Sequence, residues 1–573
     1  MNRRESLVKL GKGFTASSLL LSGCAHPSYK KKLKPKELKS DLVIIGGGLG
    51  GCACALAALR SGLNVIMTEE TDWIGGQLTS QGVPPDEHRW IESFGCTKSY
   101  RELRNAIRNY YKKHYPLTSK AKESKYFNPG AGSVSRLCHE PEVALKCLNE
   151  LLLPYVSRQQ LTILTNSRIT GADVDGDSIN YVEVINLKSG SSHVLNGKIF
   201  ADATELGDLL HFSKCEHVMG TEGKKATGEL HMPQKASSAN QQAFTMCFAL
   251  DYDPGKEHII DKPKQYEFWR NCVPELMPPW PGRLLDFTYT HPSSLEPRLL
   301  GFNPDGPHQS GIINLWRYRR ILSSAQFDQS SGIGDVSLIN WPQNDYMEGN
   351  LAGVTDELRQ HHINNSKQLS LSLLYWLQTE APREDGGEGW PGLRLRKDIM
   401  STEDGLAKFP YVRESRRIKA LTTIFEHHCG TQARQQLLDT KENVTAQSYQ
   451  DSVGIGQYPI DLHPTSEGDN YIDFSALPFE LPLGALIPQR LENLIPTCKN
   501  IGTTHITNGC YRLHPVEWNI GEVAGYLASS SISKGHPPRS FVENTHRLKD
   551  FQDHITGQGV EIHWPTEIKS NGH

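Results

Sequence analysis

The stretch DLVIIGGGLGGCACALAALRSGLNVIMTEE, residues 41–70, decides the fold. A short apolar run meets Gly46, Gly48 and Gly51 at the spacing G-x-G-x-x-G, and a small-residue segment and a second apolar run follow. Glycines at these positions allow a tight turn from strand to helix, let backbone N–H groups approach a pyrophosphate, and let the helix pack closely on the strand. The order strand, helix, strand predicts an α/β domain of Rossmann type with a dinucleotide site at its first turn.

Acidic residues stand at the end of the second apolar run. An acid roughly 20 positions after the glycine turn accepts hydrogen bonds from ribose hydroxyls, and Glu69 and Glu70 both meet that spacing. The helix N-terminus, which includes Gly50, presents unpaired N–H donors and partial positive charge to the phosphates. A glycine turn with a purely structural role is the alternative, because such turns are common.

The first 40 residues differ from the rest of the chain. Arg3 and Arg4 precede a short apolar run that ends in Leu-Ser-Gly-Cys at Cys24. This layout is that of a secretory signal; the arginine pair resembles a twin-arginine export signal, and the last four residues resemble a bacterial lipobox. We therefore expect a signal peptide over 1–24, a basic tether over 25–40, and an exported lipoprotein on the periplasmic face of a bacterial membrane. An ordinary secretory signal, or a decayed one on a cytoplasmic protein, is the alternative.

Charge is divided unevenly along the chain. Residues 1–40 hold ten of the 61 Lys and Arg and two of the 64 Asp and Glu, which leaves a net charge of −11 on the remainder. An acidic body with a basic tail argues against a nucleic-acid partner. No run of roughly 18 or more apolar residues occurs, so no membrane-spanning helix is predicted. The oligomeric state is left open by these features.

At 573 residues the chain is too long for one core, so several domains are expected. The expected helices are 100–115, 140–152, 355–379, 413–425 and 515–529. Antiparallel strands are expected across 161–200, and further strands over 198–204, 481–488 and 493–502. The expected organisation is a discontinuous nucleotide domain over 41–211 and 461–535, an inserted α+β substrate or cap domain over 212–460, and a C-terminal extension over 536–573.

Three features favour FAD over NAD as the dinucleotide. Gly75, Gly76 and the adjacent Gln77 follow Glu69 at the distance where a flavoprotein chain turns along the flavin. Asp-Ala-Thr at 202–204 follows a β-meander and matches a second FAD contact. A helix that starts at Pro515 would direct its N-terminus at the flavin and stabilise the charge of reduced flavin. The other glycine clusters follow no apolar strand, so no NAD(P)H fingerprint is found.

Long strings between residues 41 and 530 resemble the bacterial FAD-dependent oxidoreductases of the glutathione-reductase-like superfamily. The most specific strings are SVSRLCHEP (133–141), ADATELGDLL (201–210), INWPQNDY (339–346), GIGQYPIDLH (454–463) and CKNIGTTHITNGCYRLHPVEWNIGEVAG (498–525). The resemblance implies bound FAD and a Rossmann-type three-layer FAD-binding domain, and it favours Glu69 over Glu70 as the ribose ligand. The FAD-binding residues that it implies are Gly46, Gly48, Gly50, Gly51, Glu69, Glu70, Gly75, Gly76, Gln77, Arg136, Ala203, Thr204, Pro515, Trp518, Asn519 and Ile520.

Histidines and an arginine near the C-terminal helix are the candidate catalytic residues. Hydride transfer from a carbon that bears OH or NH benefits from a nearby base, and histidine suits neutral pH. His505, in the expected loop before the helix, is the first choice; His514 and His463, with Asp461 to orient it, are the others. Arg512 is expected to neutralise a substrate carboxylate or the flavin's negative charge. A structural role is the alternative for each.

The chemistry expected is dehydrogenation of a small polar donor, which is either an alcohol of sugar-like type or an amine. Electrons would pass to flavin N5 as a hydride and then to oxygen, a quinone or a carrier. The alternatives are a flavin monooxygenase, a non-redox flavoenzyme and a non-catalytic FAD-containing surface protein. No metal is expected, because the chain has no C-x-x-C pair and its adjacent histidines would diverge by about 100° on a helix.

Overall fold

The computed structural model describes residues 35–306 and 310–568. Its central element is a five-stranded parallel sheet with the order β23-β8-β2-β3-β4. These strands are β2 (Leu42–Ile45), β3 (Val65–Thr68), β4 (Leu161–Leu164), β8 (Ile199–Asp202) and β23 (Leu494–Pro496). Because β23 joins the sheet only after a long intervening region, this domain is discontinuous along the chain.

The side chains of β2 divide between two hydrophobic cores. Leu42 and Ile44 belong to the larger core, whereas Val43 and Ile45 belong to a smaller core that includes Ile66 and Phe200 of the neighbouring strands. This division follows from the two-residue period of a strand. Because both faces of the sheet are covered, all four residues of β2 are apolar and buried.

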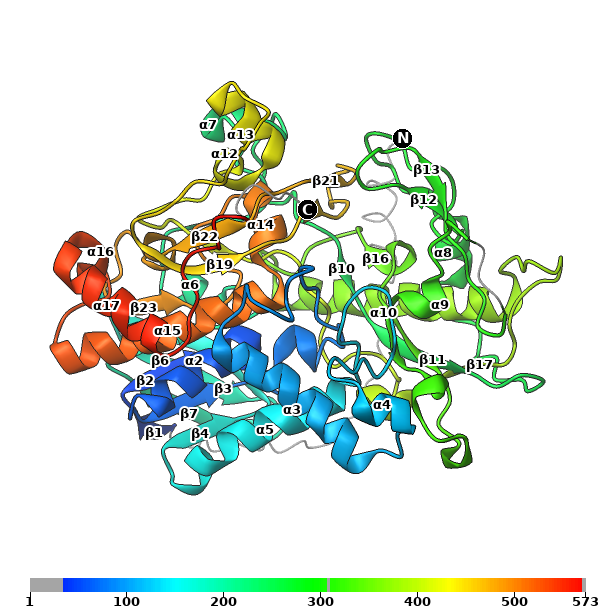
Figure 1. Cartoon of the computed structure of the whole chain (residues 1–573), viewed down its shortest axis with the longest axis horizontal. Helices are drawn as coiled ribbons and strands as arrows, with labels where there is room; N and C mark the ends of the chain where they lie inside the picture. Colours follow the sequence, from blue (N-terminus) through cyan, green and yellow to red (C-terminus); the bar gives the residue numbers. More distant parts are fainter. Residues whose placement is uncertain (1–34, 307–309, 569–573) are drawn as a thin grey trace, which may run out of the picture. The chain divides into compact units, whose positions relative to one another are not determined.

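Helices pack on one side of the parallel sheet, and an antiparallel sheet shares the core of the other. Helix α2 (Leu49–Arg60) contacts β2 and β3 and packs against α15 (His514–Lys534) (Figure 1); α5 (Pro141–Ser157) contacts β4 and α3 (Lys98–His114). The smaller core is completed by β5 (Ser167–Asp175), β6 (Ser178–Asn186) and β7 (Ser192–Asn196), which form a sheet with β1 (Lys36–Lys39). The predicted three-layer Rossmann-type domain is confirmed.

The region between β8 and β23 contains a second sheet and a long helix. Strands β11 (Phe248–Tyr252), β14 (Arg320–Leu322), β15 (Val336–Ile339) and β17 (Leu393–Leu395) are antiparallel, in the order β14-β15-β11-β17. Helix α10 (Asp356–Thr379) begins after Thr355, whose hydroxyl accepts a hydrogen bond from the N–H of Leu358 at 3.3 Å. A threonine N-cap of this kind satisfies a donor that the helix itself cannot pair. This mixture of helix and sheet agrees with an additional α+β region; its expected boundaries stay a prediction.

Shorter elements complete the described chain. Paired strands are β9 (His217–Val218) with β18 (Arg417–Ile418), β10 (Phe244–Thr245) with β16 (Asp345–Tyr346), β12 (Thr288–Thr290) with β13 (Pro297–Leu299), β19 (Ser452–Gly456) with β22 (Phe479–Pro482), and β20 (Ile460–Leu462) with β21 (Ile472–Phe474). The shorter helices include α4 (Ser119–Glu123), α6 (Asp208–Phe212), α7 (Lys224–Thr227), α8 (Tyr266–Asn271), α9 (Leu315–Tyr318), α11 (Lys397–Met400), α12 (Glu426–Cys429), α13 (Thr431–Leu438), α14 (His505–Tyr511), α16 (Ser540–Glu543) and α17 (Thr545–Gly557). Among residues 35–306 and 310–568, no helix is both long and apolar enough to cross a membrane.

The helix predicted over 413–425 is wrong. This segment is irregular apart from the two residues of β18, so Arg413 and Arg417 do not share a helix face. All five residues from Arg413 to Arg417 are buried, and their charged side chains bind partners on different elements. A surface helix exposes one face to water, whereas this segment runs through the interior with its charges paired by tertiary contacts.

Three further expectations need correction. Residues 36–39, assigned to the tether, form β1 and pair with β7. The strand expected over 481–488 ends at Pro482, and it pairs with β19 rather than with the parallel sheet. His505 does not lie in a loop but is the first residue of α14, after the N-cap Thr504. In each case a partner distant in sequence decides the structure. The signal and lipobox, residues 1–24, lie outside the described residues.

Candidate functional site

The glycine turn brings the end of β2 against the end of β8. Gly46 has φ +96°, and a Cβ there would lie 2.3 Å from the carbonyl oxygen of Ala203. Only glycine combines this backbone angle with so close an approach. The predicted contacts Gly46 and Ala203 are therefore brought together at the carboxyl ends of adjacent parallel strands, which is where ligands bind in open α/β sheets.

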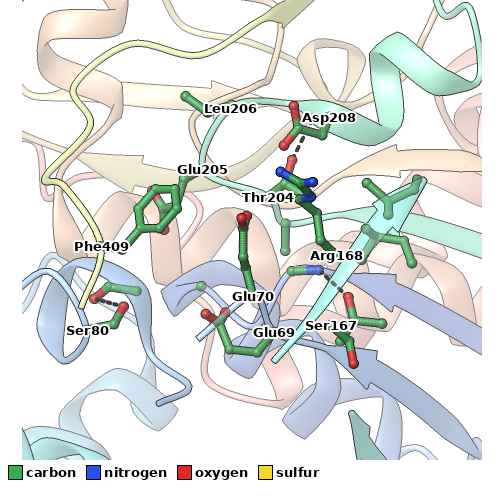
Figure 2. A pocket seen from close by; sticks show the side chains of 17 residues that line it. Glu69, Glu70, Ser80, Ser167, Arg168, Thr204, Glu205, Leu206, Asp208 and Phe409 are labelled. Carbon is green, nitrogen blue, oxygen red and sulfur yellow. Dashed lines mark hydrogen bonds between the residues drawn. The ribbon is translucent and has the colours of Figure 1, made fainter. Parts of the chain in front are cut away.

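A cavity lies beside this turn, and we call it the glycine-turn cavity. Figure 2 shows its lining side chains, which come from the ends of β3 and β8, the start of β5 and the segment near Phe409. Seven of the predicted FAD contacts line it: Gly46, Gly48, Glu69, Glu70, Gly76, Ala203 and Thr204. Residues far apart in the sequence thus form one site at the glycine turn.

The two acids at the end of β3 have different surroundings (Figure 2). Glu69 accepts hydrogen bonds from the backbone N–H of Gly47 at 3.0 Å and of Thr71 at 2.8 Å. Burial raises the pKa of Glu69 and of Glu70 to about 7 in each case. Glu69 therefore fastens the glycine turn to the end of β3, and both acids line the cavity.

Glu517 is a residue of the site that the sequence analysis missed. It lies in the first turn of α15 and accepts a hydrogen bond from the N–H of Gly50 at 3.2 Å and another from the side chain of Gln77. Burial, with the charge of Glu205 added, raises the pKa of Glu517. Glu517 therefore ties the N-terminus of α2 to the first turn of α15 and to Gln77. The feature of the sequence that could have identified Glu517 is an acidic residue in the first turn of the helix.

The remaining predicted FAD residues fall into two groups: some lie at the glycine turn or at the start of α15, and the others lie away from the cavity. Gly75 donates its N–H to the carbonyl oxygen of Gly47 at 2.7 Å, so it joins the turn, and Pro515 begins α15. Trp518 donates to Ser99 Oγ at 2.6 Å and Asn519 to the carbonyl oxygen of Val453 at 3.2 Å. These two side chains, with the buried Ile520 and Gly51, hold α15 and α2 in place rather than lining the cavity. Arg136 is exposed and lies outside the cavity lining.

A second cavity is lined mainly by side chains of the inserted region, and we call it the arginine cavity. Its wall holds three arginines, three aspartates, one histidine and five tyrosines. The predicted residues His463, Asp461 and Arg512 are brought together here, while Arg319, Asp86 and Asp473 were missed. No local pattern marks these three, since each comes from a different segment of the chain.

The two cavities share elements of their walls. Phe409 lines the glycine-turn cavity, and Tyr411 and Arg413, two and four residues later, line the arginine cavity. On another side, Gln77 follows Gly76 of the first cavity and donates to the carbonyl oxygen of Arg512 of the second at 3.0 Å. One hydrogen bond thus joins the glycine turn to a wall residue of the arginine cavity.

Buried polar atoms without a partner mark the space between the cavities. Among residues 35–306 and 310–568, such atoms include Glu205 Oε1, Gln81 Nε2 and both polar side-chain atoms of Gln457. Glu205 lines the glycine-turn cavity, and Gln81 accepts from the N–H of Val412, between Tyr411 and Arg413. Buried polar groups require hydrogen-bond partners, and the polar edge of a flavin supplies both donors and acceptors. The residues present therefore fit FAD.

His463 is the predicted base that lies in the arginine cavity. Its Nδ1 is 2.6 Å from Asp345 Oδ2, and its Nε2 is 3.7 Å from Asp461 Oδ2. Asp345 rather than Asp461 is thus its closer partner. Against the raising effect of burial, Arg413 and His463 hold the pKa of Asp345 below its usual value. Asp345 therefore holds the ring of His463 through Nδ1.

Asp461 and Asp473 face each other on β20 and β21. Against the raising effect of burial, His463 and Arg512 lower the pKa of Asp461, whereas burial and the charge of Asp461 raise that of Asp473 to about 6. Two carboxyl groups with separated pKa values beside a histidine provide one permanent acceptor and one group that can exchange a proton.

The other two predicted bases line neither cavity. His505 is fully buried, with Nδ1 3.1 Å from both oxygens of Glu414, which raises its pKa although burial works to lower it. His514 accepts from the N–H of Asp86 at 3.1 Å, and burial together with Arg319 lowers its pKa well below the usual value. His505 is thus a buried partner of Glu414 in an interior ion network, and His514 hydrogen-bonds the backbone of Asp86.

Comparisons with known proteins bear on the cofactor rather than on single residues of the site. A family model described as "FAD dependent oxidoreductase" matches residues 41–555. Bilirubin reductase from Mediterraneibacter gnavus is 37% identical over 57 residues, which are 10% of this chain and 9% of that protein. The chain thus spans about a tenth of that curated relative.

Solved structures give more distant similarities. E. coli quinol fumarate reductase is 11% identical, with a TM-score of 0.31, over 91% of this chain and 74% of that one. L-proline dehydrogenase from P. horikoshii is 16% identical, with a TM-score of 0.18, over 33% and 25% of the two chains. The family match, which spans most of the chain, is the comparison that bears on its cofactor.

Proposed function

Because the chain belongs to the family of FAD dependent oxidoreductases, we propose that it dehydrogenates a small polar alcohol or amine in the arginine cavity. FAD, when bound, supplies the acceptor for the hydride and its two electrons. Oxygen, a quinone or a small carrier then takes the electrons. The observation that supports the proposal is the hydrogen bond from Gln77 to the carbonyl oxygen of Arg512, which connects the glycine turn to the arginine cavity that holds His463.

The protein's own residues provide for the proton that leaves the donor. Asp345 accepts from His463 Nδ1 and holds the ring, so that Nε2 receives the proton of the hydroxyl or amino group. Arg512 donates to the hydroxyl of Tyr411 at 2.8 Å, which fixes two polar groups of the wall. The tyrosine and tryptophan faces that surround them exclude water from the donor carbon.

Anaerobic reduction of the bound flavin tests this function. We expect one class of alcohols or amines to bleach the yellow absorbance of the FAD-loaded protein without added NADPH or oxygen. Replacement of His463 by asparagine should slow this bleaching about 100- to 10,000-fold, the usual contribution of a general base, while FAD content is retained. Arg60→Gln, which alters a partly exposed ion pair with Glu102, is the matched control and should leave the rate unchanged.

The outcomes separate the alternatives. Turnover that requires both NADPH and oxygen would show that the protein is a monooxygenase rather than a dehydrogenase. Catalysis of a reaction without net oxidation would indicate a non-redox flavoenzyme. Bound FAD that no alcohol or amine reduces would favour a non-catalytic FAD-containing protein.

We also propose that the protein works outside the cytoplasm as a lipoprotein. The support is in the sequence: the arginine pair at Arg3 and Arg4, the short apolar run, and Leu-Ser-Gly-Cys ending at Cys24. A flavoprotein loaded with FAD in the cytoplasm suits export after folding, as the twin-arginine signal implies. We expect Cys24→Ala to move most of the protein from the membrane to the soluble fraction, as measured by cell fractionation. Retention of this variant in the membrane would contradict anchoring at Cys24.

A further inference from the structure

We propose that the donor carries a carboxylate, so that the arginine cavity takes a hydroxy acid or an amino acid held by Arg319, Arg413 and Arg512. This inference rests on the proposed function, because it names the substrate class of the same cavity. It goes further in selecting acids over neutral sugars, polyols and simple amines.

The first support is the gathering of three guanidinium groups in one wall. Arg319, Arg413 and Arg512 come from distant segments, and each is more than nine-tenths buried. Their contacts to acids are long for charge-assisted hydrogen bonds, at 3.3 Å to Asp86, 3.0 Å to Asp345 and 3.4 Å to Asp461. By comparison, the interior pair of Arg417 and Glu222 is 2.8 Å apart. Arg413 also donates to the carbonyl oxygen of Ala243 at 2.9 Å and to Thr245 Oγ1 at 3.0 Å, so the capacity that all three arginines retain is an unpaired Nε.

The second support is the chemistry of the unpaired atoms. Among the described residues of this wall, the buried polar atoms without a partner are all donors. They are the Nε of the three arginines, Asn340 Nδ2 and Trp341 Nε1. A carboxylate offers only acceptor oxygens and pairs with guanidinium in a planar, two-bond geometry. A neutral polyol brings a donor with every hydroxyl and matches this surplus of donors less well.

The third support is the presence of acceptors for the reacting group in the same wall. Asp461 and Asp473 face each other beside His463, while the guanidinium of Arg512 reaches the carbonyl oxygen of Asp461 at 3.0 Å. A substrate carboxylate on the arginines thus leaves an adjacent hydroxyl or amino group near carboxylate and imidazole acceptors. Oxidation removes a hydride from the carbon to FAD and a proton from oxygen or nitrogen to His463, and the carbon acquires a double bond to that atom.

Matched acids and amides provide the binding test. The FAD-loaded protein is titrated with succinate against succinamide, and with benzoate against benzamide, and the flavin absorbance spectrum and melting temperature are recorded. We expect the acids to perturb both signals at concentrations at least about 10-fold lower than the amides, the discrimination expected for a charged hydrogen bond. Equal binding of acids and amides would overturn the inference.

Variants of Arg319 test whether this arginine binds the carboxylate. The double change Arg319→Gln with Asp86→Asn removes the pair together and leaves no unpaired buried charge. We expect acid binding about 10- to 100-fold weaker in this variant, and an intermediate loss in Arg319→Lys. Arg394→Gln is the matched control, because Arg394 pairs with Asp251 on β11, outside this cavity. FAD content and melting temperature show that the variants are folded; unchanged acid binding in both Arg319 variants would refute the assignment.

Failure of this inference is distinguishable from failure of the proposed function. If acids bind through Arg319 but no hydroxy or amino acid reduces the flavin, the carboxylate site is supported and the proposed dehydrogenation is refuted. If neutral alcohols or amines reduce the flavin and acids do not bind, the proposed dehydrogenation is supported and the carboxylate site is refuted.

Discussion

Gly521→Ala will destabilise the FAD-binding domain by about 3 kcal/mol or more and strongly reduce its FAD content. A Cβ at Gly521 would lie 2.0 Å from the carbonyl oxygen of Gly50, which is backbone and cannot rotate away. In turn, a Cβ at Gly50 would lie 1.8 Å from the carbonyl oxygen of Thr497. Helices α2 and α15 therefore touch through bare backbone, and one methyl group must push α2 and its N-terminus away from the cofactor.

Urea unfolding and the FAD content of the purified protein measure this effect. Gly557→Ala is the control: no atom lies within 4 Å of its Cβ position, at the end of α17. We expect the control to change the free energy of unfolding by no more than about 1 kcal/mol, in the stabilising direction. A Gly521→Ala protein with parental FAD content and unfolding midpoint would contradict the helix contact.

Glu414→Gln will have the second large effect, a loss of about 3–5 kcal/mol near pH 5.5. The Glu414 carboxylate is buried; it binds Arg417, lies 3.1 Å from His505 Nδ1, and accepts from the N–H of Gln242 at 3.1 Å. Glutamine preserves the shape but leaves two buried cations with less negative charge. Glu222, at 2.8 Å from Arg417, compensates in part.

The pH dependence identifies the charge as the cause. Although burial works to raise it, His505 and Arg417 lower the pKa of Glu414 to about 2, so its contribution is complete above the unfolded value of 4.5 and is lost as the pH falls toward 2. The pKa of His505 is raised by Glu414, so its contribution is complete below the unfolded value of 6.5 and is lost as the pH rises through the folded value. The stability difference between the two proteins should therefore be largest between pH 4.5 and 6.5.

Urea unfolding at three pH values provides the measurement. The difference should shrink at pH values below 4.5 and above the folded pKa of His505. Glu142→Gln is the control, because Glu142 forms a half-exposed ion pair with Lys146 on α5 and is expected to contribute less than about 0.5 kcal/mol. A difference for Glu414→Gln that does not vary with pH would show that its charge is not the stabilising feature.

The parts of the fold that were predicted correctly depend on local sequence. The run from Leu42 to Ile45 followed by the glycine turn predicts β2 and the start of α2, and the helices expected over 100–115, 140–152, 355–379 and 515–529 match α3, α5, α10 and α15 within a few residues. The wrong predictions concern segments whose structure depends on contacts with residues distant in the sequence. The segment 413–417 carries alternating charges that fit a surface helix, yet each charge is paired in the interior with a different element.

The candidate site shows the same division. Gly46, Gly76 and Ala203 were predicted because a phosphate turn and its neighbours demand small residues at fixed spacing. Glu517 and Arg319 were not, because each acquires its role from residues hundreds of positions away in the chain. His505 was the first choice of base in the sequence and His463 a lesser one, and only the folded chain shows that His505 is a buried member of an ion network whereas His463 lines the cavity.

The sequence by itself determined the Rossmann-type FAD-binding domain, because backbone angles and close packing at a dinucleotide turn permit only glycine at a few positions of one short stretch. The tertiary structure alone decided which polar side chains face the substrate. Arg319, Arg413, Arg512 and His463 converge from separate segments on one cavity. Such convergence is set by the packing of whole elements, and no local spacing encodes it.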